Sequence, residues 1–383
     1  MLSFEFATAN RIIFGAGKIK ELPNQLLGRV KRLLLVRGKS SHAIPLMREM
    51  LFAQGIPFIE LEIHGEPTLE AAREGAKLAR ECDMVVGLGG GSVLDAGKAV
   101  AALATNPGDV LDYLEVIGKG KPLLNAPLPY IAIPTTAGTG SEVTRNAVIE
   151  SPQYGVKVSL RSPLMLPSVA LVDPELTHDL PPAVTASSGL DALAQLIEPF
   201  VSWKANPMTD ALCREGIRCV ALSLREAYHN GADVSAREGM SLASLFGGLA
   251  LANAGLGVVH GFAAPLGAML HAPHGALCAQ LLPLVMDANI KALETRQAGH
   301  PALSRYAEVA WIVTGHQNTS AQDGVKWVSE LVQELEIPAL SVHGMTATRI
   351  PEAVEKAMKA SSTKGNPILL TETELSKVLE QAL

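Results

Sequence analysis

The residues MVVGLGGGSVLDAGKAVAALA, numbered 84–104, decide the fold class of this chain. Met84 to Leu88 is a short apolar run of the kind that forms a buried strand, and Val93 to Ala104 has the composition of a helix. Consecutive glycines at positions 89–91, followed by Ser92, connect the two. A strand, a glycine-rich turn and a helix in this order predict a βα unit of a parallel sheet.

Similar apolar runs occur on both sides of this unit. Arg32 to Arg37 predicts another strand, and the helical pattern Ile44 to Gln54 comes shortly after it. Tyr130 to Ile133 and Val169 to Val172 predict two further strands. Because strands alternate with helices, we expect residues 1–180 to form an α/β domain with an open parallel sheet.

The character of the sequence changes past Leu180. Pro181 and Pro182 mark a break, after which Ala and Leu recur at helical spacing with almost no β-branched runs. The polar stretch 316–322 predicts a loop between helices, and a last helix is expected from about Glu372 to the end of the chain. The sequence therefore predicts an all-helical domain over residues 181–383.

Composition excludes several classes of protein. At 383 residues, with 48% hydrophobic and 18% charged residues, the chain is expected to be globular and long enough for two cores. A net charge of −6 argues against a nucleic-acid partner, which would want a basic face. The N-terminal residues lack the basic region of a signal or transit peptide, and the longest apolar runs, such as Leu249 to Ala254, are too short to span a membrane.

The four cysteines show no CxxC pair and no spacing typical of a disulfide framework. Reduced thiols of a cytoplasmic protein are expected to look like this. We interpret them as buried small apolar residues. They are Cys82, Cys213, Cys219 and Cys278.

The glycine turn after Leu88 is a candidate phosphate site. Glycines let the backbone approach a bulky anion, and the amides at the start of the next helix attract phosphate. Gly89, Gly90, Gly91 and Ser92 are therefore predicted to hold the phosphates of a nucleotide. The alternative is an ordinary glycine turn, and the stretch does not match the GxGxxG pattern of a standard dinucleotide-binding domain.

A second loop, residues 134–142, also follows a predicted strand. Hydroxyls and glycine amides at the carboxyl end of a parallel strand lie where open α/β sheets bind ligands. We expect this loop to line a cofactor, although Ser141 or Thr139 could instead cap the next element. The candidate contacts are Thr135, Thr136, Thr139 and Ser141.

Asp191, His260 and His274 are candidate metal ligands. A carboxylate and two imidazoles suit a divalent transition metal, and three protein ligands leave a position for substrate. Asp191 and Gln195 lie at i and i+4 on one face of a predicted helix. Asp191 could instead cap that helix, and a histidine in apolar surroundings such as those of His260 is often a core residue. His274, between a proline and a glycine, is expected on a turn.

Two further residues carry weaker signals. His271 could be a general acid or a wall of the substrate pocket. Lys157 is the one cation just before the expected domain boundary and could reach cofactor or substrate. Its alternative interpretation is a solvated lysine on a strand edge.

Taken together, these stretches resemble the iron-containing (group III) alcohol dehydrogenases, which are similar in organisation to glycerol dehydrogenase and 3-dehydroquinate synthase. The resemblance implies a nucleotide-binding α/β domain, a helical C-terminal domain and catalysis in the cleft between them. It is carried by GGGSVLDAGKA (89–99), PTTAGTGSEVT (134–144), VDPELTHDLPP (172–182), GLDALAQLIE (189–198), VVHGFAAPLGAMLHAPHG (258–275) and KGNP (364–367).

This chain departs from the family pattern at two places. The family's metal motif is DxxxH, with four ligands in all, but Gln195 stands at the histidine. The related glycerol dehydrogenases hold zinc with one Asp and two His, so the resemblance still implies Fe²⁺ or Zn²⁺ at Asp191, His260 and His274. Ala264 replaces a histidine thought to relay protons, which leaves a water on the metal, His271 or the cofactor ribose as the proton route.

The residues after the first predicted strand bear on the cofactor. NAD-preferring members often place an Asp near Gly38, but this chain has Arg37, Gly38, Lys39 and Ser40 there. Two cations without the acid favour the 2′-phosphate of NADP(H) over NAD(H) by Coulomb attraction. Gly38, Lys39 and Ser40 are thus predicted cofactor contacts, together with Asp95 and Lys157.

The sequence thus predicts a metal-dependent, NAD(P)-linked alcohol dehydrogenase or aldehyde reductase that transfers hydride to or from a small substrate. A small apolar pocket is expected around Phe262, Ala264 and Leu270. We expect a cytoplasmic homodimer without a membrane or nucleic-acid partner. The alternatives are a metal-free reductase resembling maleylacetate reductase, a lyase like 3-dehydroquinate synthase, for which the motifs supply few Lys and Arg, and a non-enzymatic scaffold.

Overall fold

The computed structural model describes residues 3–26, 28, 30–39 and 41–383. The chain divides into two compact units. The α/β unit consists of Ala7–Thr136 and Gly140–Asp179, and the helical unit of Leu180–Leu383 with Ala137–Thr139 and the described part of residues 1–6. Each unit is described by itself below.

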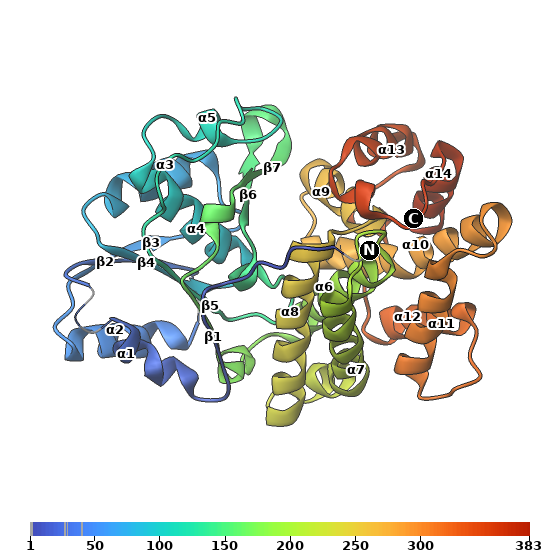
Figure 1. The fold of residues 1–383 in the computed structure, drawn as a ribbon, viewed down its shortest axis with the longest axis horizontal. Coiled ribbons are helices and arrows are strands. Elements are labelled where there is room, and N and C mark those ends of the chain that lie inside the picture. Colours follow the sequence, from blue (N-terminus) through green and yellow to red (C-terminus); the bar gives the residue numbers. More distant parts are fainter. Residues whose placement is uncertain (1–2, 27, 29, 40) are drawn as a thin grey trace. The chain divides into compact units, whose positions relative to one another are not determined.

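The α/β unit contains a six-stranded sheet in which every paired strand is parallel (Figure 1). The predicted open parallel sheet is confirmed, and the four predicted strands are present. The two additional strands were not predicted, because one has three residues and the other alternates with glutamates. In spatial order the strands are β1 (Ile12–Phe14), β8 (Val169–Val172), β5 (Tyr130–Pro134), β4 (Met84–Gly89), β2 (Leu33–Arg37) and β3 (Phe58–Glu62).

The central strands are buried on both faces. Leu33 and Leu35 of β2 belong to one apolar cluster, whereas Leu34 and Val36 belong to another, because successive residues of a strand point to opposite sides. This two-sided burial is why the sequence shows continuous apolar runs rather than alternation. The helices of this unit are α1 (Leu22–Leu26), α2 (Ala43–Ala53), α3 (Leu69–Ala79), α4 (Gly91–Thr105) and α5 (Val110–Tyr113).

A two-stranded antiparallel hairpin, β6 (Asn146–Ser151) and β7 (Val156–Arg161), accompanies the main sheet. Its inward residues, such as Ile149 and Leu160, pack in a cluster with α3, α4 and α5. This hairpin was not predicted from the sequence. Short 3-10 helices in this unit are Lys18–Glu21, Ser141–Val143, Pro152–Tyr154, Pro163–Met165 and Pro174–Thr177.

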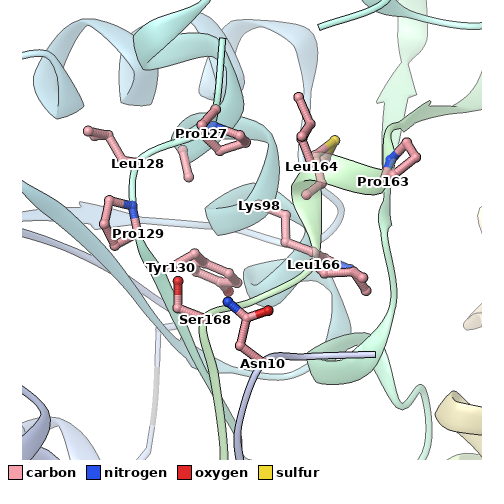
Figure 2. Close-up of a pocket in the computed structure, with 13 residues that line it drawn as sticks. Asn10, Lys98, Pro127, Leu128, Pro129, Tyr130, Pro163, Leu164, Leu166 and Ser168 are labelled. Atoms are coloured by element: carbon pink, nitrogen blue, oxygen red, sulfur yellow. The ribbon is translucent and has the colours of Figure 1, made fainter. Parts of the chain in front are cut away.

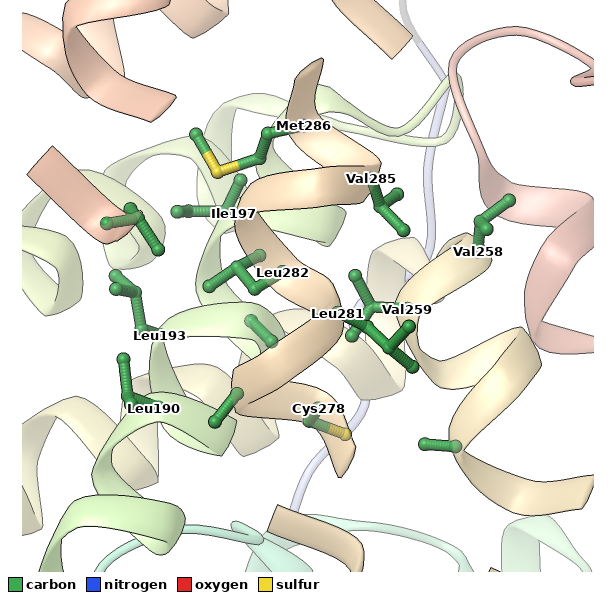
Figure 3. Close-up of a cluster of buried hydrophobic side chains, with 14 of the residues drawn as sticks. Leu190, Leu193, Ile197, Val258, Val259, Cys278, Leu281, Leu282, Val285 and Met286 are labelled. Atoms are coloured by element: carbon green, nitrogen blue, oxygen red, sulfur yellow. The ribbon is translucent and has the colours of Figure 1, made fainter. Parts of the chain in front are cut away.

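The second unit is helical, as predicted. Its helices pack around one large apolar core, part of which is drawn in Figure 3. The helices are α6 (Pro182–Val201), α7 (Pro207–His229), α8 (Val234–Ala254), α9 (Val258–Leu270), α10 (His274–Arg296), α11 (Pro301–Thr314), α12 (Ala321–Glu334), α13 (Ile350–Lys359) and α14 (Glu372–Gln381), with 3-10 helices Leu340–His343, Ala347–Arg349 and Ser362–Gly365.

One alternative interpretation and one expectation for this unit were wrong. Helix α6 begins at Pro182, where a proline suits the first helical position, so Asp191 lies in the middle of the helix and does not cap it. His274 does not lie on a turn, because it is the first residue of α10. Both changes place the two side chains on rigid helices.

Helix α10 is the one helix in the described part of the chain that is long and apolar enough to span a membrane. This helix was not recognised from apolar runs in the sequence, because Pro283 and several polar residues interrupt it. However, 72% of its apolar window is buried inside the unit. Packing in the core therefore accounts for its hydropathy.

Candidate active site

Four side chains of the helical unit bring their donor atoms together. Asp191, His260, His274 and Cys278 each offer one potential ligand atom, and these atoms all lie within 4.8 Å of one another. The Asp191 Oδ1 atom lies 3.3 Å from His260 Nε2 and 3.9 Å from His274 Nε2, and His274 Nε2 lies 3.5 Å from Cys278 Sγ. The three predicted metal ligands are thus adjacent in space.

The chemistry of this cluster fits a cation. Asp191 Oδ1 and His260 Nε2 are buried and have no hydrogen-bond partner among the described residues. Buried polar atoms are nearly always satisfied in folded proteins, so two converging acceptors without partners indicate a missing positive group. The residues present therefore fit a divalent metal ion.

Glu198 fixes the orientation of His260. The Nδ1 atom of His260 lies 2.6 Å from Glu198 Oε2, and the other oxygen of Glu198 accepts a hydrogen bond from the Val259 amide at 2.7 Å. Because an ionised carboxylate only accepts, Nδ1 carries a proton, and Nε2 is the atom that can present a lone pair to a metal once its own proton is lost. Carboxylate–histidine pairs commonly orient metal ligands in this way.

Gln195 orients Asp191. Its amide nitrogen donates to Asp191 Oδ2 at 2.8 Å, which leaves Oδ1 facing the cluster. The atom that faces a carboxylate has to be a donor, so the amide nitrogen is the end of Gln195 that faces Asp191, and the amide oxygen is buried without a hydrogen-bond partner among the described residues. Gln195 therefore acts on the site through Asp191.

The charges within the cluster favour the ionised forms of Asp191 and His260. Burial raises the pKa of Asp191, but the close contact with His260 and the charge of His274 outweigh burial and lower the pKa to about 2. Burial lowers the pKa of His260, but the negative charges of Cys278 and Glu198 raise it well above its usual value. Protons therefore occupy this negative site when a metal does not, and metal binding has to displace them.

Two residues of this site were missed by the sequence analysis. Glu198 follows Asp191 and Gln195 on the same helix face, at i+7, and this spacing was available in the sequence. Cys278 was interpreted only as a buried small apolar residue. It is buried and not disulfide-bonded, but its sulfur belongs to the donor cluster, one helical turn after His274 on α10.

The predicted phosphate loop lies at the carboxyl edge of the sheet. In the sheet register Leu88 is paired with Arg37 and Ile133, so the loops after β2, β4 and β5 leave the same edge. This brings the segments that contain Gly38, Gly90 and Thr135 together. Helix α4 begins at Gly91, and a Cβ atom on Gly90 would lie 3.3 Å from the Thr136 side chain, so backbone amides and a hydroxyl residue line the loop.

The remaining cofactor candidates have mixed surroundings. Lys39 is exposed at the end of β2, whereas Ser40 lies outside the described residues. Thr139 groups with the helical unit. Asp95 accepts hydrogen bonds from Ser141 Oγ at 2.6 Å and from the Val148 amide at 2.8 Å, which ties α4 to the loop after β5 and to β6. Their cofactor roles stay predictions.

Lys157 lies in β7 and pairs with Glu66. The Nζ atom lies 2.9 Å from Glu66 Oε1, and the other Glu66 oxygen accepts from Ser92 Oγ at 3.3 Å. This places Lys157 beside the first turn of α4, within the α/β unit, whereas the donor cluster belongs to the helical unit. A catalytic role for Lys157 stays a prediction, and its closest recorded partner is a carboxylate.

His271 is exposed and ends α9 in a left-handed conformation, with φ of 50°. A residue other than glycine rarely adopts this conformation, so the chain turns sharply between α9 and α10 at this point. The proposed role of His271 as an acid stays a prediction. The expected pocket residue Phe262 is fully buried in the helical core, so that assignment was wrong.

Arg37 differs from the expectation of a free cation. It forms ion pairs with Glu60 and Glu62, each at 2.7 Å, and its side chain is only 14% exposed. Its charge is therefore balanced within the sheet. Lys39 alone remains of the two cations that favoured NADP(H).

A cavity of about 310 Å³ lies elsewhere in the α/β unit (Figure 2). Tyr130 and Ser168, at or just before the first residues of β5 and β8, line it together with Asn10 and Lys98. These strand starts are at the end of the sheet opposite to the phosphate loop. The cavity is therefore separate from the predicted cofactor site.

The sequence matches the iron-containing alcohol dehydrogenase family over residues 9–174 and the C-terminal domain of the Fe-containing alcohol dehydrogenase family over residues 185–383. The chain belongs to the iron-containing alcohol dehydrogenase family. The predicted resemblance and the assignment to the oxidoreductases are thereby confirmed.

Similar proteins cover all or nearly all of the chain. A choline dehydrogenase of Bacillus subtilis (strain 168) is 36% identical, with 97% of this chain and 92% of the relative covered. The crystal structure of a 1,3-propanediol oxidoreductase has a TM-score of 0.92 at 34% identity and covers 100% of both chains. A sulfoacetaldehyde reductase of Bifidobacterium kashiwanohense, solved in complex with NAD⁺, has a TM-score of 0.87 at 27% identity, with 100% of this chain and 99% of that chain covered.

Proposed function

We propose that this protein is a metal-dependent, NAD(P)-linked alcohol dehydrogenase that interconverts a small alcohol and its aldehyde. The observation that carries the proposal is the buried donor cluster of Asp191, His260 and His274, with acceptor atoms that lack partners among the described residues. Membership of an alcohol dehydrogenase family supports it. The metal-free reductase, the lyase and the scaffold have no comparable support.

The residues divide the work between the two units. Asp191, His260 and His274 would hold a divalent metal, which when bound supplies Lewis-acid polarisation of the substrate oxygen. Gln195 and Glu198 keep the ligand atoms pointed at one place. In the α/β unit, the first-turn amides of α4 and the Ser92 hydroxyl would bind the cofactor phosphates.

The substrate class is small alcohols and aldehydes. The relatives named above act, by name, on choline, 1,3-propanediol and sulfoacetaldehyde, which differ in charge but share a short chain. Short aldehydes of each charge type would be screened, with the loss of the reduced nicotinamide absorbance as the readout, to identify the preferred substrate. The proposed class would be contradicted if no aldehyde is reduced and no short alcohol is oxidised in the reverse direction.

We propose NADP(H) as the preferred cofactor, with Lys39 as the cation near the 2′-phosphate. Because Arg37 is already paired with Glu60 and Glu62, only the exposed Lys39 can favour NADP(H) over NAD(H), and we expect the preference to be modest. Changing Lys39→Ala should lower kcat/KM for NADPH about tenfold and leave kcat/KM for NADH nearly unchanged. Equal losses with both cofactors would contradict this role.

The central experiment measures metal content together with activity. Protein purified without added metal is assayed for iron and zinc, and for NADPH-dependent aldehyde reduction before and after chelation. Metal approaching one ion per chain and loss of turnover on chelation are expected. Turnover that survives complete removal of metal would overturn the metal-dependent mechanism and favour the metal-free reductase.

Cytoplasmic location and a homodimer are also proposed. All four cysteines are unpaired, which suits a reducing compartment. Light scattering of the purified protein tests the dimer, and a mass of one chain at micromolar concentration would contradict it.

A further inference from the structure

We propose that Cys278 is the fourth metal ligand of this chain and that the resulting Asp-His-His-Cys centre binds Zn²⁺ in preference to Fe²⁺. This inference rests on the metal dependence proposed above, but it concerns which atoms bind and which ion they select. Gln195 and Cys278 lie on different helices, α6 and α10, so the ligand set is not the DxxxH pattern with one member missing.

The distances fit a zinc ion with four protein ligands near tetrahedral geometry, which would expand to five ligands when the substrate oxygen binds. Zinc binds nitrogen and oxygen at roughly 2.0–2.2 Å and sulfur at about 2.3 Å, so two ligands of a tetrahedron lie roughly 3.3–3.6 Å apart. The Cys278 Sγ atom lies 3.5 Å from His274 Nε2, and His260 Nε2 lies 3.3 Å from Asp191 Oδ1. The third recorded edge, from Asp191 Oδ1 to His274 Nε2, is 3.9 Å and requires only a small approach.

The helix geometry explains why the sulfur is present at this spot. His274 and Cys278 are at i and i+4, so their side chains lie on one face of α10. Figure 3 shows Cys278 one turn before Leu281 and Leu282, which face the apolar core. Cys278 belongs to the apolar core cluster, but its sulfur also lies within 4.8 Å of a carboxylate and two imidazoles, which a core-filling role alone does not require.

Gln195 offers a weaker ligand than Cys278. Its amide nitrogen, which does not bind metal, donates to Asp191 Oδ2. Its neutral amide oxygen is buried without a partner among the described residues, and it is a weaker zinc ligand than a thiolate. Cys278 therefore restores a count of four protein ligands by a different route. A ligand at position 278 would let this chain lack the family histidine at position 195 and keep a complete donor set.

The charge and softness of the ligands set the metal preference. A carboxylate and a thiolate carry two negative charges, which balance a divalent ion in a buried site. Thiolate is a soft ligand that favours zinc over ferrous iron, and zinc also lies higher in the general affinity order. The exchange of an imidazole for a thiolate is thus expected to move the site away from iron.

Cobalt(II) tests the ligand directly. Co²⁺ is added to full-length apoprotein of the wild type, of Cys278→Ser and of Cys278→Ala, and the near-ultraviolet sulfur-to-cobalt charge-transfer band is recorded. Cys213→Ala is the matched control, because Cys213 is also fully buried in the helical core but lies outside the donor cluster. The band is expected in the wild type and in Cys213→Ala and not in either Cys278 variant.

Metal competition gives the second readout. Apoprotein is equilibrated anaerobically with equal Zn²⁺ and Fe²⁺, and bound metal is quantified. We expect the wild type to bind mostly zinc, and Cys278→Ser to lose at least about tenfold in the zinc-to-iron ratio. Circular dichroism of each variant checks that it is folded.

The outcomes separate this inference from the proposed function. Cobalt that binds to the wild type without a charge-transfer band, or a band that survives in Cys278→Ser, would overturn the role of Cys278 and leave metal-dependent catalysis intact. An apoprotein that binds neither Co²⁺ nor Zn²⁺ would overturn both.

Discussion

At the scale of single residues, a role that follows from residue type can be predicted from the sequence, whereas a role that depends on neighbours in space cannot. Asp191, His260 and His274 were recognisable because carboxylates and imidazoles are uncommon in apolar helices. Glu198 was not, because its role appears only when α9 brings His260 Nδ1 within 2.6 Å of it. Cys278 was missed because the expected turn at His274 would have removed the i, i+4 relation.

The role of Glu198 can be tested with the substitution Glu198→Gln, which keeps the size of the side chain. In Glu198→Gln the single amide oxygen can still accept from His260 Nδ1, but the NH₂ group replaces the oxygen that accepts from the Val259 amide, and the negative charge that supports the ligand is lost. Zinc affinity is expected to fall about 10–100-fold, the range seen when the partner of a ligating histidine is altered. Competition with a chromogenic chelator measures it.

A control for this variant is Glu215→Gln on the surface of α7, where Glu215 pairs with Arg218. Its zinc affinity should match that of the wild type. If Glu198→Gln also binds zinc as tightly as the wild type, the carboxylate does not tune His260 and is only a structural partner of the Val259 amide.

At the scale of elements, the sequence predicts what is apolar and continuous. The four strands β2, β4, β5 and β8 were predicted from buried runs. Strand β3 was not predicted, because Glu60 and Glu62 interrupt its apolar residues. The hairpin β6–β7 was not predicted, because its strands alternate buried and less buried residues and contain no continuous apolar run. The glutamates of β3 have a structural role that composition alone does not show.

Glu60 joins three elements by ion pairs. It lies 2.7 Å from Arg37 of β2 and 2.6 Å from Arg48 of α2, and its side chain is 20% exposed. The hydrogen bond from Arg48 does most to lower the pKa of Glu60, burial opposes it, and Arg37 adds to the lowering, which brings the pKa from 4.5 to about 2. The folded state therefore favours the ionised form.

This depressed pKa predicts how stability depends on pH. Its stabilising contribution is present above the unfolded pKa near 4.5 and is lost as the pH falls from there through 2. After allowance for solvent screening, Glu60→Gln should cost about 2 kcal/mol of unfolding free energy at pH 7 and much less at pH 2.5. Urea unfolding at the two pH values measures the difference.

The surface pair of Arg32 and Glu81 provides the comparison, because Glu81 is 65% exposed. Glu81→Gln is expected to change stability by less than about 0.5 kcal/mol at either pH. A Glu60→Gln cost that is equally small, or that stays constant between pH 7 and pH 2.5, would show that the ion pairs of β3 contribute little.

At the scale of the whole molecule, the change of composition near residue 180 predicts two kinds of structure, but not every segment follows it. Residues 137–139 group with the helical unit although the residues on either side belong to the α/β unit. A Cβ atom on Gly138 would lie 2.7 Å from that of Ser188, so this loop packs closely on α6. This contact could not be predicted from the sequence, because nothing in a glycine-rich loop indicates which helix it packs against.

The separation of ligands between units gives the last prediction. All four donor atoms of the proposed metal cluster belong to the helical unit, whereas the predicted phosphate loop belongs to the α/β unit. A ligand that binds only the folded state stabilises it, by about 2.7 kcal/mol at one hundred times its dissociation constant. Each ligand should therefore slow amide hydrogen exchange chiefly in the unit that holds it.

Hydrogen exchange measured by mass spectrometry distinguishes the two effects. Zn²⁺ added to apoprotein should protect peptides of α6, α9 and α10, and NADPH should protect the start of α4 and the loops after β2 and β5. In Asp191→Asn, which loses the ligand charge, zinc protection should disappear while NADPH protection persists. Zinc protection of β2, β4 and β5 as strong as that of α6 would contradict a metal site confined to the helices, because the ion would then be stabilising residues that supply none of its proposed ligands.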